Sequence, residues 1–423
     1  MACLIDLPDE LLSAISECFV PLRQFVLEES TAFQVRMATN RLRRSTLVSL
    51  CRTSKRCKRV AQLHLYSGII VNDPTTQACE RLDHLLWTVI DNPKLAALVR
   101  YLEYRPQMIE KSVESNRPYE QAIHRVASTI FTTFDASVFR NASYGDKFAV
   151  AQLALLLYLV PKITHLSCTI NAEYVWMETP LLLQALGLES LALPAHSELP
   201  PLPNLQYLCL LSTDPDQPTS SNASSSALIP WGYVLGATTK MPNLRHYIQS
   251  GVRYGLKTSN FSMLRTLCFH ETLVPIENVC IAIENCVNLH TFIYSMASGH
   301  EESRSKPSFD ASGIPAALIS SKNTLQYLVL VHSHEQQLQW IQPLTSLRDL
   351  VALRVLTVSV RLIEPLRDHS CDISSYLPPS MEKINICLQA NNSVDSFLSY
   401  LNVITEKKIE CRVEKELDLS LMG

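Results

Sequence analysis

Residues 325–330 read Leu-Gln-Tyr-Leu-Val-Leu, and residues 353–358, 28 positions further along, read Leu-Arg-Val-Leu-Thr-Val. Both stretches follow the pattern L-x-x-L-x-L, with apolar substitutions. The last two apolar residues of the pattern are two positions apart, so they point to the same side of an extended chain. The pattern therefore predicts short strands that each commit one face to a core.

The same pattern recurs along the chain. Clear copies begin at Ile163, Leu188, Leu205, Leu264, Leu289, Leu325, Leu353 and Met381, a weak copy holds Leu244 and Tyr247, and an outlying copy holds Val99, Leu102 and Tyr104. Several copies follow a helix-like stretch, as residues 276–286 precede Leu289. Small chain-breaking residues such as Asn204 and Asn288 often stand just before the strand.

A strand that alternates with a helix and returns about every 20–29 residues is typical of leucine-rich-repeat solenoids. One such unit cannot bury its own apolar stripe, so the units stack. Each buried leucine contributes about 1.5–3 kcal/mol to folding. We therefore expect an irregular α/β leucine-rich-repeat solenoid over residues 161–423, with loops near 212–228 and 298–314. The alternative is a flat α/β domain whose strands are leucine-rich by chance.

The third, fifth and seventh positions of each copy face away from the core leucines. In a solenoid that side is the usual binding surface. The residues at these positions that we expect to contact a protein substrate are Tyr207, Thr266, His270, Thr291, Tyr327 and Thr357. Several of their neighbours, such as Cys268 and Val329, are apolar. Either an apolar partner or another layer of the chain therefore covers this face.

Residues 1–70 predict a small all-helical module. Helices are expected over residues 4–19, 22–44 and 46–66, followed by a mostly helical connecting region over residues 71–160. Pro8 suits a first helical turn, where Asp9 and Glu10 complement the positive end of the helix. A module of this size has a thin core, so pairing with a partner would offset that weakness.

Glycine is scarce, with 10 in 423 residues, against an average of about 7%. Phosphate-binding loops and nucleophile elbows depend on glycine, and the sequence holds no G-x-G-x-x-G, Walker-type loop or G-x-S-x-G. The net charge of -3 does not favour nucleic acid or an anionic membrane as partner. We therefore expect no cofactor, no nucleic acid and no catalytic residues. An enzyme hidden in the repeat region is a minor alternative.

Targeting and metal signals are weak. The N-terminus, MACLIDLPDELL, is not typical of a signal peptide, and the longest apolar run, residues 148–160, is too short to span a membrane. The 13 cysteines are scattered, which predicts reduced, buried thiols in a cytoplasmic or nuclear protein. His332 and His334 have no evident third ligand, so we expect no metal site and ordinary surface residues there.

The N-terminal pattern resembles the F-box. Residues 4–15, Leu-Ile-Asp-Leu-Pro-Asp-Glu-Leu-Leu-Ser-Ala-Ile, are similar to the opening L-P-x-E-[IL]-L-x-x-I of that family. Residues 47–61, followed by His-Leu-Tyr at 64–66, are similar to its closing part. The sequence departs from the family in a longer gap between the two halves and in Cys57, which replaces an aromatic residue. With leucine-rich repeats behind it, the chain resembles the F-box/leucine-rich-repeat proteins abundant in fungi.

The resemblance implies a function. F-box proteins are the substrate receptors of Skp–cullin–F-box ubiquitin ligases, in which the F-box binds the Skp adaptor, and through it cullin, while the C-terminal domain captures a protein substrate. The matching positions that the resemblance assigns to adaptor binding are Leu7, Pro8, Leu11, Ile15, Leu47, Leu50 and Cys51. The alternative is a leucine-rich-repeat scaffold that acts outside ubiquitination.

Overall fold

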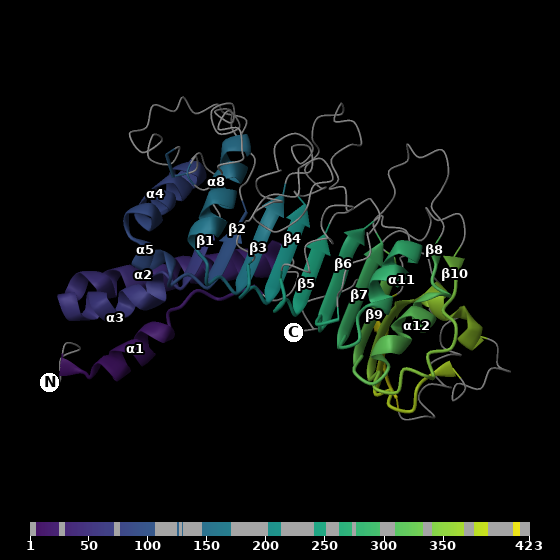
Figure 1. Cartoon of the computed structure of the whole chain (residues 1–423). Helices are drawn as coiled ribbons and strands as arrows, with labels where there is room; N and C mark the ends of the chain where they lie inside the picture. Colours follow the sequence, from purple (N-terminus) through teal and green to yellow (C-terminus); the bar gives the residue numbers. More distant parts are fainter. Residues whose placement is uncertain are drawn as a thin grey trace. The chain divides into compact units, whose positions relative to one another are not determined.

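A computed structural model describes residues 6–24, 30–71, 77–105, 125–126, 129, 146–170, 202–212, 241–250, 262–272, 276–296, 309–332, 341–367, 376–387 and 409–414 (Figure 1). Within these ranges the chain is mixed α and β, with eight α-helices and a parallel sheet of eleven strands. No described helix is both long enough and apolar enough to cross a bilayer.

The helices gather towards the N-terminus, and strands dominate later. The α-helices are α1 (Asp9–Glu17), α2 (Ser30–Thr53), α3 (Lys55–Leu65), α4 (Gln77–Asp91), α5 (Pro93–Ala96), α8 (Asp146–Leu159), α11 (Ile276–Glu284) and α12 (Ile314–Ala317). The sheet holds β1 (Gly68–Val71), β2 (Tyr101–Tyr104), β3 (His165–Ile170), β4 (Tyr207–Ser212), β5 (His246–Ser250), β6 (Thr266–Thr272), β7 (Thr291–Met296), β9 (Tyr327–His332), β11 (Val355–Ser359), β12 (Lys383–Cys387) and β13 (Glu410–Glu414), in that order. A separate parallel pair is formed by β8 (Phe309–Asp310) and β10 (Ile341–Gln342), and 3-10 turns cover Leu318–Ser321 and Val360–Arg367.

Every copy of the leucine-rich pattern that the structure describes forms a strand, which confirms the strand prediction. The clear copies supply β3, β4, β6, β7, β9, β11 and β12, the weak copy supplies β5, and the outlying copy supplies β2. The copy at Leu188 lies outside the described residues. Four strands were not predicted: β8 and β10 of the separate pair, and β1 and β13 of the large sheet. Ile69 and Val71 of β1 nevertheless have the two-residue spacing of the other copies.

The strands pair in a register that aligns the pattern from copy to copy. Leu328 of β9 lies opposite Phe292 of β7 and Leu356 of β11. All three side chains are buried completely. The same alignment repeats two residues further along each strand, so the apolar pairs of neighbouring copies form continuous rows in the core. Each buried leucine stabilises the fold by about 1.5–3 kcal/mol, which explains why the pattern selects this register.

Side chains just ahead of the strands join successive copies. The amide of Asn288 donates to the carbonyl of Ser262 at 2.9 Å, and the hydroxyl of Thr324 donates to the carbonyl of Leu289 at 2.9 Å. Asn204 and Ser380 make equivalent bonds to the carbonyls of the preceding copies. The small polar residues noted in the sequence therefore satisfy the backbone of the turn before them.

The helical prediction for the N-terminus is wrong in several boundaries. Residues 6–8 and 22–24 are not α-helical, and β1 begins at Gly68 within the module predicted to be all-helical. A break was expected near residue 45, but α2 continues to Thr53 and α3 begins at Lys55. Ser54 sets this boundary, because its backbone is extended and its hydroxyl accepts the N–H of Cys57, as an N-cap does. The region 71–160, predicted mostly helical, also contains β2.

Contacts divide the chain into two units. The first comprises Met1–Thr169, Tyr174–Leu208 and Leu419–Gly423, and the second comprises Ile170–Glu173 and Cys209–Asp418. The boundaries expected at residues 70 and 160 stay predictions. Of the two loops expected over residues 212–228 and 298–314, residues 213–228 and 298–308 lie outside the described residues. Ser212 ends β4, and residues 309–314 hold β8, a turn and the first residue of α12.

The cysteines whose side chains are described are all free thiols. Cys168, Cys209 and Cys268 are buried within strands, as predicted. Cys18, in contrast, is exposed at the end of α1, so burial is not general.

Candidate functional site

Helix α1 lies on α3 through one acidic residue and a small apolar cluster. The carboxylate of Asp9 accepts hydrogen bonds from Arg56 Nε at 2.7 Å and from Arg59 Nη2 at 2.5 Å. The bond from Arg56, together with that from Arg59, holds the pKa of Asp9 below its ordinary value. Asp9 also stands in the first turn of α1, where a negative charge is favoured.

The apolar cluster fixes which face of α1 is covered. Leu12 packs with Cys57 and Val60 of α3, and Leu7 packs against these three. Cys57 therefore occupies a core position between the two helices. Further along, the hydroxyl of Ser13 lies 2.9 Å from Nε2 of His64.

This packing leaves part of α1 open to solvent. The side chain of Leu11 is 51% exposed, Pro8 is exposed, and Ile15 is half-buried. The remaining expected docking residues, Leu50 and Cys51 near the end of α2, are half-buried.

Leu47 does not belong to this exposed group. Its side chain is wholly buried, so Leu47 is a core residue of this conformation. Its expected contact with an adaptor stays a prediction.

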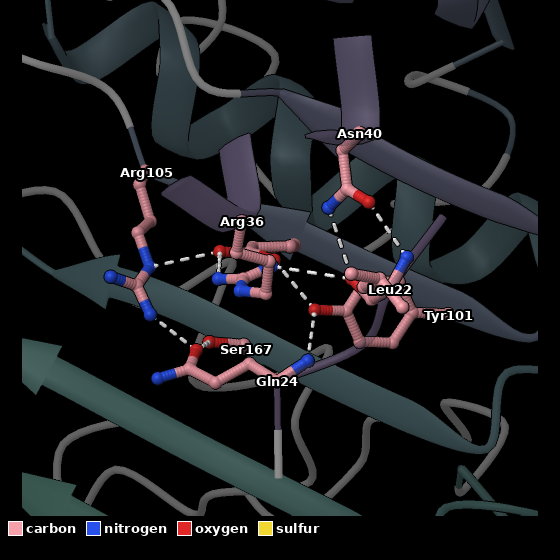
Figure 2. A network of polar contacts seen from close by, with 8 residues as sticks. Leu22, Gln24, Arg36, Asn40, Tyr101, Arg105 and Ser167 are labelled. Carbon is pink, nitrogen blue, oxygen red and sulfur yellow. Dashed lines mark hydrogen bonds and ion pairs between the residues drawn. The ribbon is translucent and has the colours of Figure 1, made fainter. Parts of the chain in front are cut away.

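Behind these helices, a buried ion pair joins α2 to β2 (Figure 2). Arg36 donates from Nη1 to Oε2 of Glu103 and from Nη2 to Oε1, each at 2.8 Å. The Tyr101 hydroxyl donates to Oε2 at 2.6 Å, and Arg105 Nε lies 3.2 Å from Oε1. Because Glu103 is wholly buried, this two-pronged pairing offsets much of the cost of removing its charge from water.

Gln24 extends the network to a second strand. Its backbone N–H donates to the Tyr101 hydroxyl at 3.0 Å. Its side-chain oxygen accepts from the hydroxyl of Ser167 in β3 at 3.0 Å and from Arg105. Figure 2 shows Gln24 with Tyr101 at one end and with Arg105 and Ser167 at the other. The segment before α2 is thereby bonded to both β2 and β3.

The same segment is also held by α2. The side chain of Asn40 accepts the N–H of Leu22 at 2.7 Å and donates to its carbonyl at 3.0 Å, and Arg43 donates to the carbonyl of Val20 at 2.9 Å. Residues 20–24 and the first half of α2 lie between the two halves of the F-box-like pattern. These residues therefore fasten α2 to the strands.

The network fixes the ionisation of its members. Burial alone would raise the pKa of Glu103, but the hydrogen bonds from Arg36 and the charges of Arg105 and Arg36 hold that pKa below its ordinary value. Burial, with the nearby Glu103 carboxylate, raises the pKa of Tyr101 far above its ordinary value. Glu103 is therefore an anion and Tyr101 a neutral donor over the whole neutral range.

Sequence reasoning did not single out Gln24, Arg36, Glu103 or Arg105. One signal was present. Glu103 occupies the fifth position of the outlying copy, where other copies carry Cys268 or Val329. A carboxylate at a position that is otherwise apolar requires a cationic partner.

The expected substrate-binding residues fall into two groups. Tyr207 and Thr357 are buried, so their side chains present no surface in this conformation, and their expected role in binding stays a prediction. Thr266, His270 and Thr291 are partly exposed, and Tyr327 is 39% exposed. The accessible members therefore lie mainly at the first residues of β6, β7 and β9.

Metal ligation finds no support in the part of the chain that the structure describes, which contains no group of three or more ligand-type side chains. His334 lies outside the described residues. His332 was expected at the surface, but it is buried at the end of β9, where its N–H donates to Ser359 Oγ at 3.0 Å. The two-residue alternation of the strand places it among core neighbours.

A scan against models of known protein families finds no match to this chain, and a search of curated proteins finds none either.

Proposed function

We propose that this chain is the substrate-recognition subunit of a Skp–cullin–F-box ubiquitin ligase. In this proposal α1, α3 and the end of α2 dock on the Skp adaptor, and through it on cullin. The strands and helices of the second unit form an irregular leucine-rich-repeat solenoid that captures a protein substrate. The chain contributes no catalytic residue and acts in the cytoplasm or nucleus.

The observation that carries the proposal is the exposure of Leu11. Asp9 and Leu12 anchor α1 on α3, so the helix is held in place while a large apolar side chain faces solvent. An apolar side chain on a fixed helix is the feature that a helical adaptor can bind at little entropic cost. The in-register rows of leucines support the repeat part of the proposal.

Co-purification with a Skp adaptor tests the docking role. The full chain is expected to bind at a one-to-one ratio. Leu11→Asp is expected to weaken binding at least about tenfold, because a carboxylate would be desolvated in the interface. The free energy of unfolding should change by no more than about 0.5 kcal/mol, since Leu11 makes little of the core.

Leu42→Asp is the matched control. Leu42 is a leucine of α2 that is 70% exposed and lies outside the docking set, so this variant should bind the adaptor as the native chain does. Failure of the native chain to bind, or equal loss in both variants, would contradict the proposal and favour a repeat scaffold that acts outside ubiquitination.

A further inference from the structure

Basic residues directly precede three neighbouring strands of the second unit. Arg245 precedes β5, whose first residue is His246, Arg265 precedes β6, and His290 precedes β7. The N–H of Arg265 donates to the carbonyl of Arg245 at 2.7 Å, and the N–H of His290 donates to the carbonyl of Arg265 at 2.8 Å. These residues therefore stand on successive rungs of the sheet, about 5 Å apart.

The side chains are close enough to affect one another. Burial first, and then the charges of Arg265, Arg245 and His290, lower the pKa of His246 below its ordinary value. Arg265 is exposed, and Arg245, His246 and His290 are half-buried. At neutral pH the two arginines supply two permanent charges, and His246 stays neutral between them.

Hydroxyl groups line the next position along the same strands. Thr266 pairs in register with His246 and Thr291, and Thr291 pairs with Tyr327. Nδ1 of His246 lies 3.0 Å from Thr266 Oγ1. These are the same threonines and tyrosine that remain accessible among the expected substrate-binding residues.

Acidic residues are missing from this row within the described residues. The first two residues of each copy from β5 to β9 include no aspartate or glutamate. The row ends where Arg354 pairs with Glu382 at 3.7 Å, both exposed. Positive charge is therefore concentrated at the start of β5–β7.

We propose that Arg245, Arg265 and His290, with Thr266, Thr291 and Tyr327, form a binding surface for an acidic segment of a protein partner. Guanidinium groups bind carboxylates through two parallel hydrogen bonds, and the hydroxyl groups can donate to the same carboxylates. Two permanent charges on a chain of net charge -3 are too few for binding to nucleic acid, which requires many phosphate contacts.

This inference rests on the proposed capture of a protein by the strands and names the chemical class of that protein segment. It does not depend on adaptor docking. Leu11→Asp should weaken adaptor binding without changing peptide binding, so the two proposals fail separately.

The test uses the full chain and a fluorescent peptide of about ten glutamates, followed by fluorescence anisotropy at low and at physiological salt. Arg265→Glu is expected to weaken binding at least about tenfold. Arg348→Glu, at an exposed arginine outside the row, makes the same change in net charge and should leave binding within about twofold. The pKa of His246, followed by NMR, should rise when the peptide binds, because an anion favours the charged imidazole.

Three outcomes would overturn the inference. The first is no binding of the glutamate peptide at low salt. The second is equal weakening by Arg265→Glu and Arg348→Glu, which would indicate a non-specific charge effect. The third is binding of a phosphoserine peptide or a single-stranded oligonucleotide in place of the glutamate peptide. Equal unfolding temperatures of the two variants exclude misfolding as the cause of a difference.

Discussion

The fifth position of the strand pattern carries different chemistry in the two units. In the first unit it is Glu103 on β2 and Ser167 on β3, and in the second unit it is Ile293 on β7 and Val329 on β9. All four side chains are buried. The first pair is buried within an ionic network supplied by the N-terminal chain, whereas the second pair needs no polar partner. At its fifth position, the strand face that points away from the leucine core is therefore not a free surface in either unit.

The largest effect is expected from breaking the ionic network. Arg36→Met leaves the Glu103 carboxylate buried with a single cationic neighbour, which should lower the free energy of unfolding by about 3–5 kcal/mol. The double variant Arg36→Met/Glu103→Leu should recover much of that loss, since no uncompensated carboxylate remains. Chemical denaturation measures both values.

Arg43→Met is the control for the loss of an arginine from α2. Arg43 bonds a single carbonyl, so this variant should lower the free energy of unfolding far less than Arg36→Met. A loss under about 1 kcal/mol for Arg36→Met would show that water reaches Glu103 and that the network is not closed.

An intermediate effect is expected in the apolar row. Val329→Ala removes two buried methyl groups and should lower the free energy of unfolding by roughly 1.5–3 kcal/mol. Thr291→Ala, on the neighbouring strand and partly exposed, should change it by about 0.5 kcal/mol or less. If both variants lower the free energy of unfolding by the same small amount, Val329 is not closely packed in the second unit.

The smallest effect concerns pH. Burial lowers the pKa of His270 to about 4, against about 6.5 in an unfolded chain. As pH falls from 7 towards 4, the unfolded chain takes up a proton before the folded chain does. Stability should therefore decrease by about 1–3 kcal/mol over this window.

His270→Gln should flatten this decrease, and an unchanged slope would contradict the assignment. Glu103 behaves differently, because its lowered pKa makes its contribution disappear only below the ordinary carboxylate range. Urea denaturation at several pH values separates the two groups.

The strands were predictable because their information is local. The spacing of Leu325, Leu328 and Leu330 places one apolar face on one strand, and this pattern identified most of the described strands. β13 was not predicted, because no leucine precedes Cys411 and Val413 at the first position of the pattern. The helix boundary at Ser54 was not predicted. The basic residues around Arg44 suggested that the second helix ends there, but α2 continues to Thr53.

The network could not be predicted, because its contacts join residues far apart in sequence. Nothing near Gln24 indicates Ser167, and nothing near Arg36 indicates Glu103. Exposure was equally hard to foresee: Tyr207 and Tyr327 occupy the same position of the pattern, yet one is buried and the other is not. The basic row was visible in the sequence only as isolated arginines, and the register of β5–β7 brought them together.

The position of Gln24 affects the order in which parts of the chain can fold during synthesis. A growing chain leaves the ribosome with its N-terminus first. The residues that complete the surroundings of Gln24 and Arg36 are Tyr101, Glu103 and Ser167. Helix α2 and residues 20–24 therefore finish packing only after β2 and β3 have been made, and Arg36 stays hydrated until β2 has emerged. During that interval this part of the chain is open to chaperones and proteases.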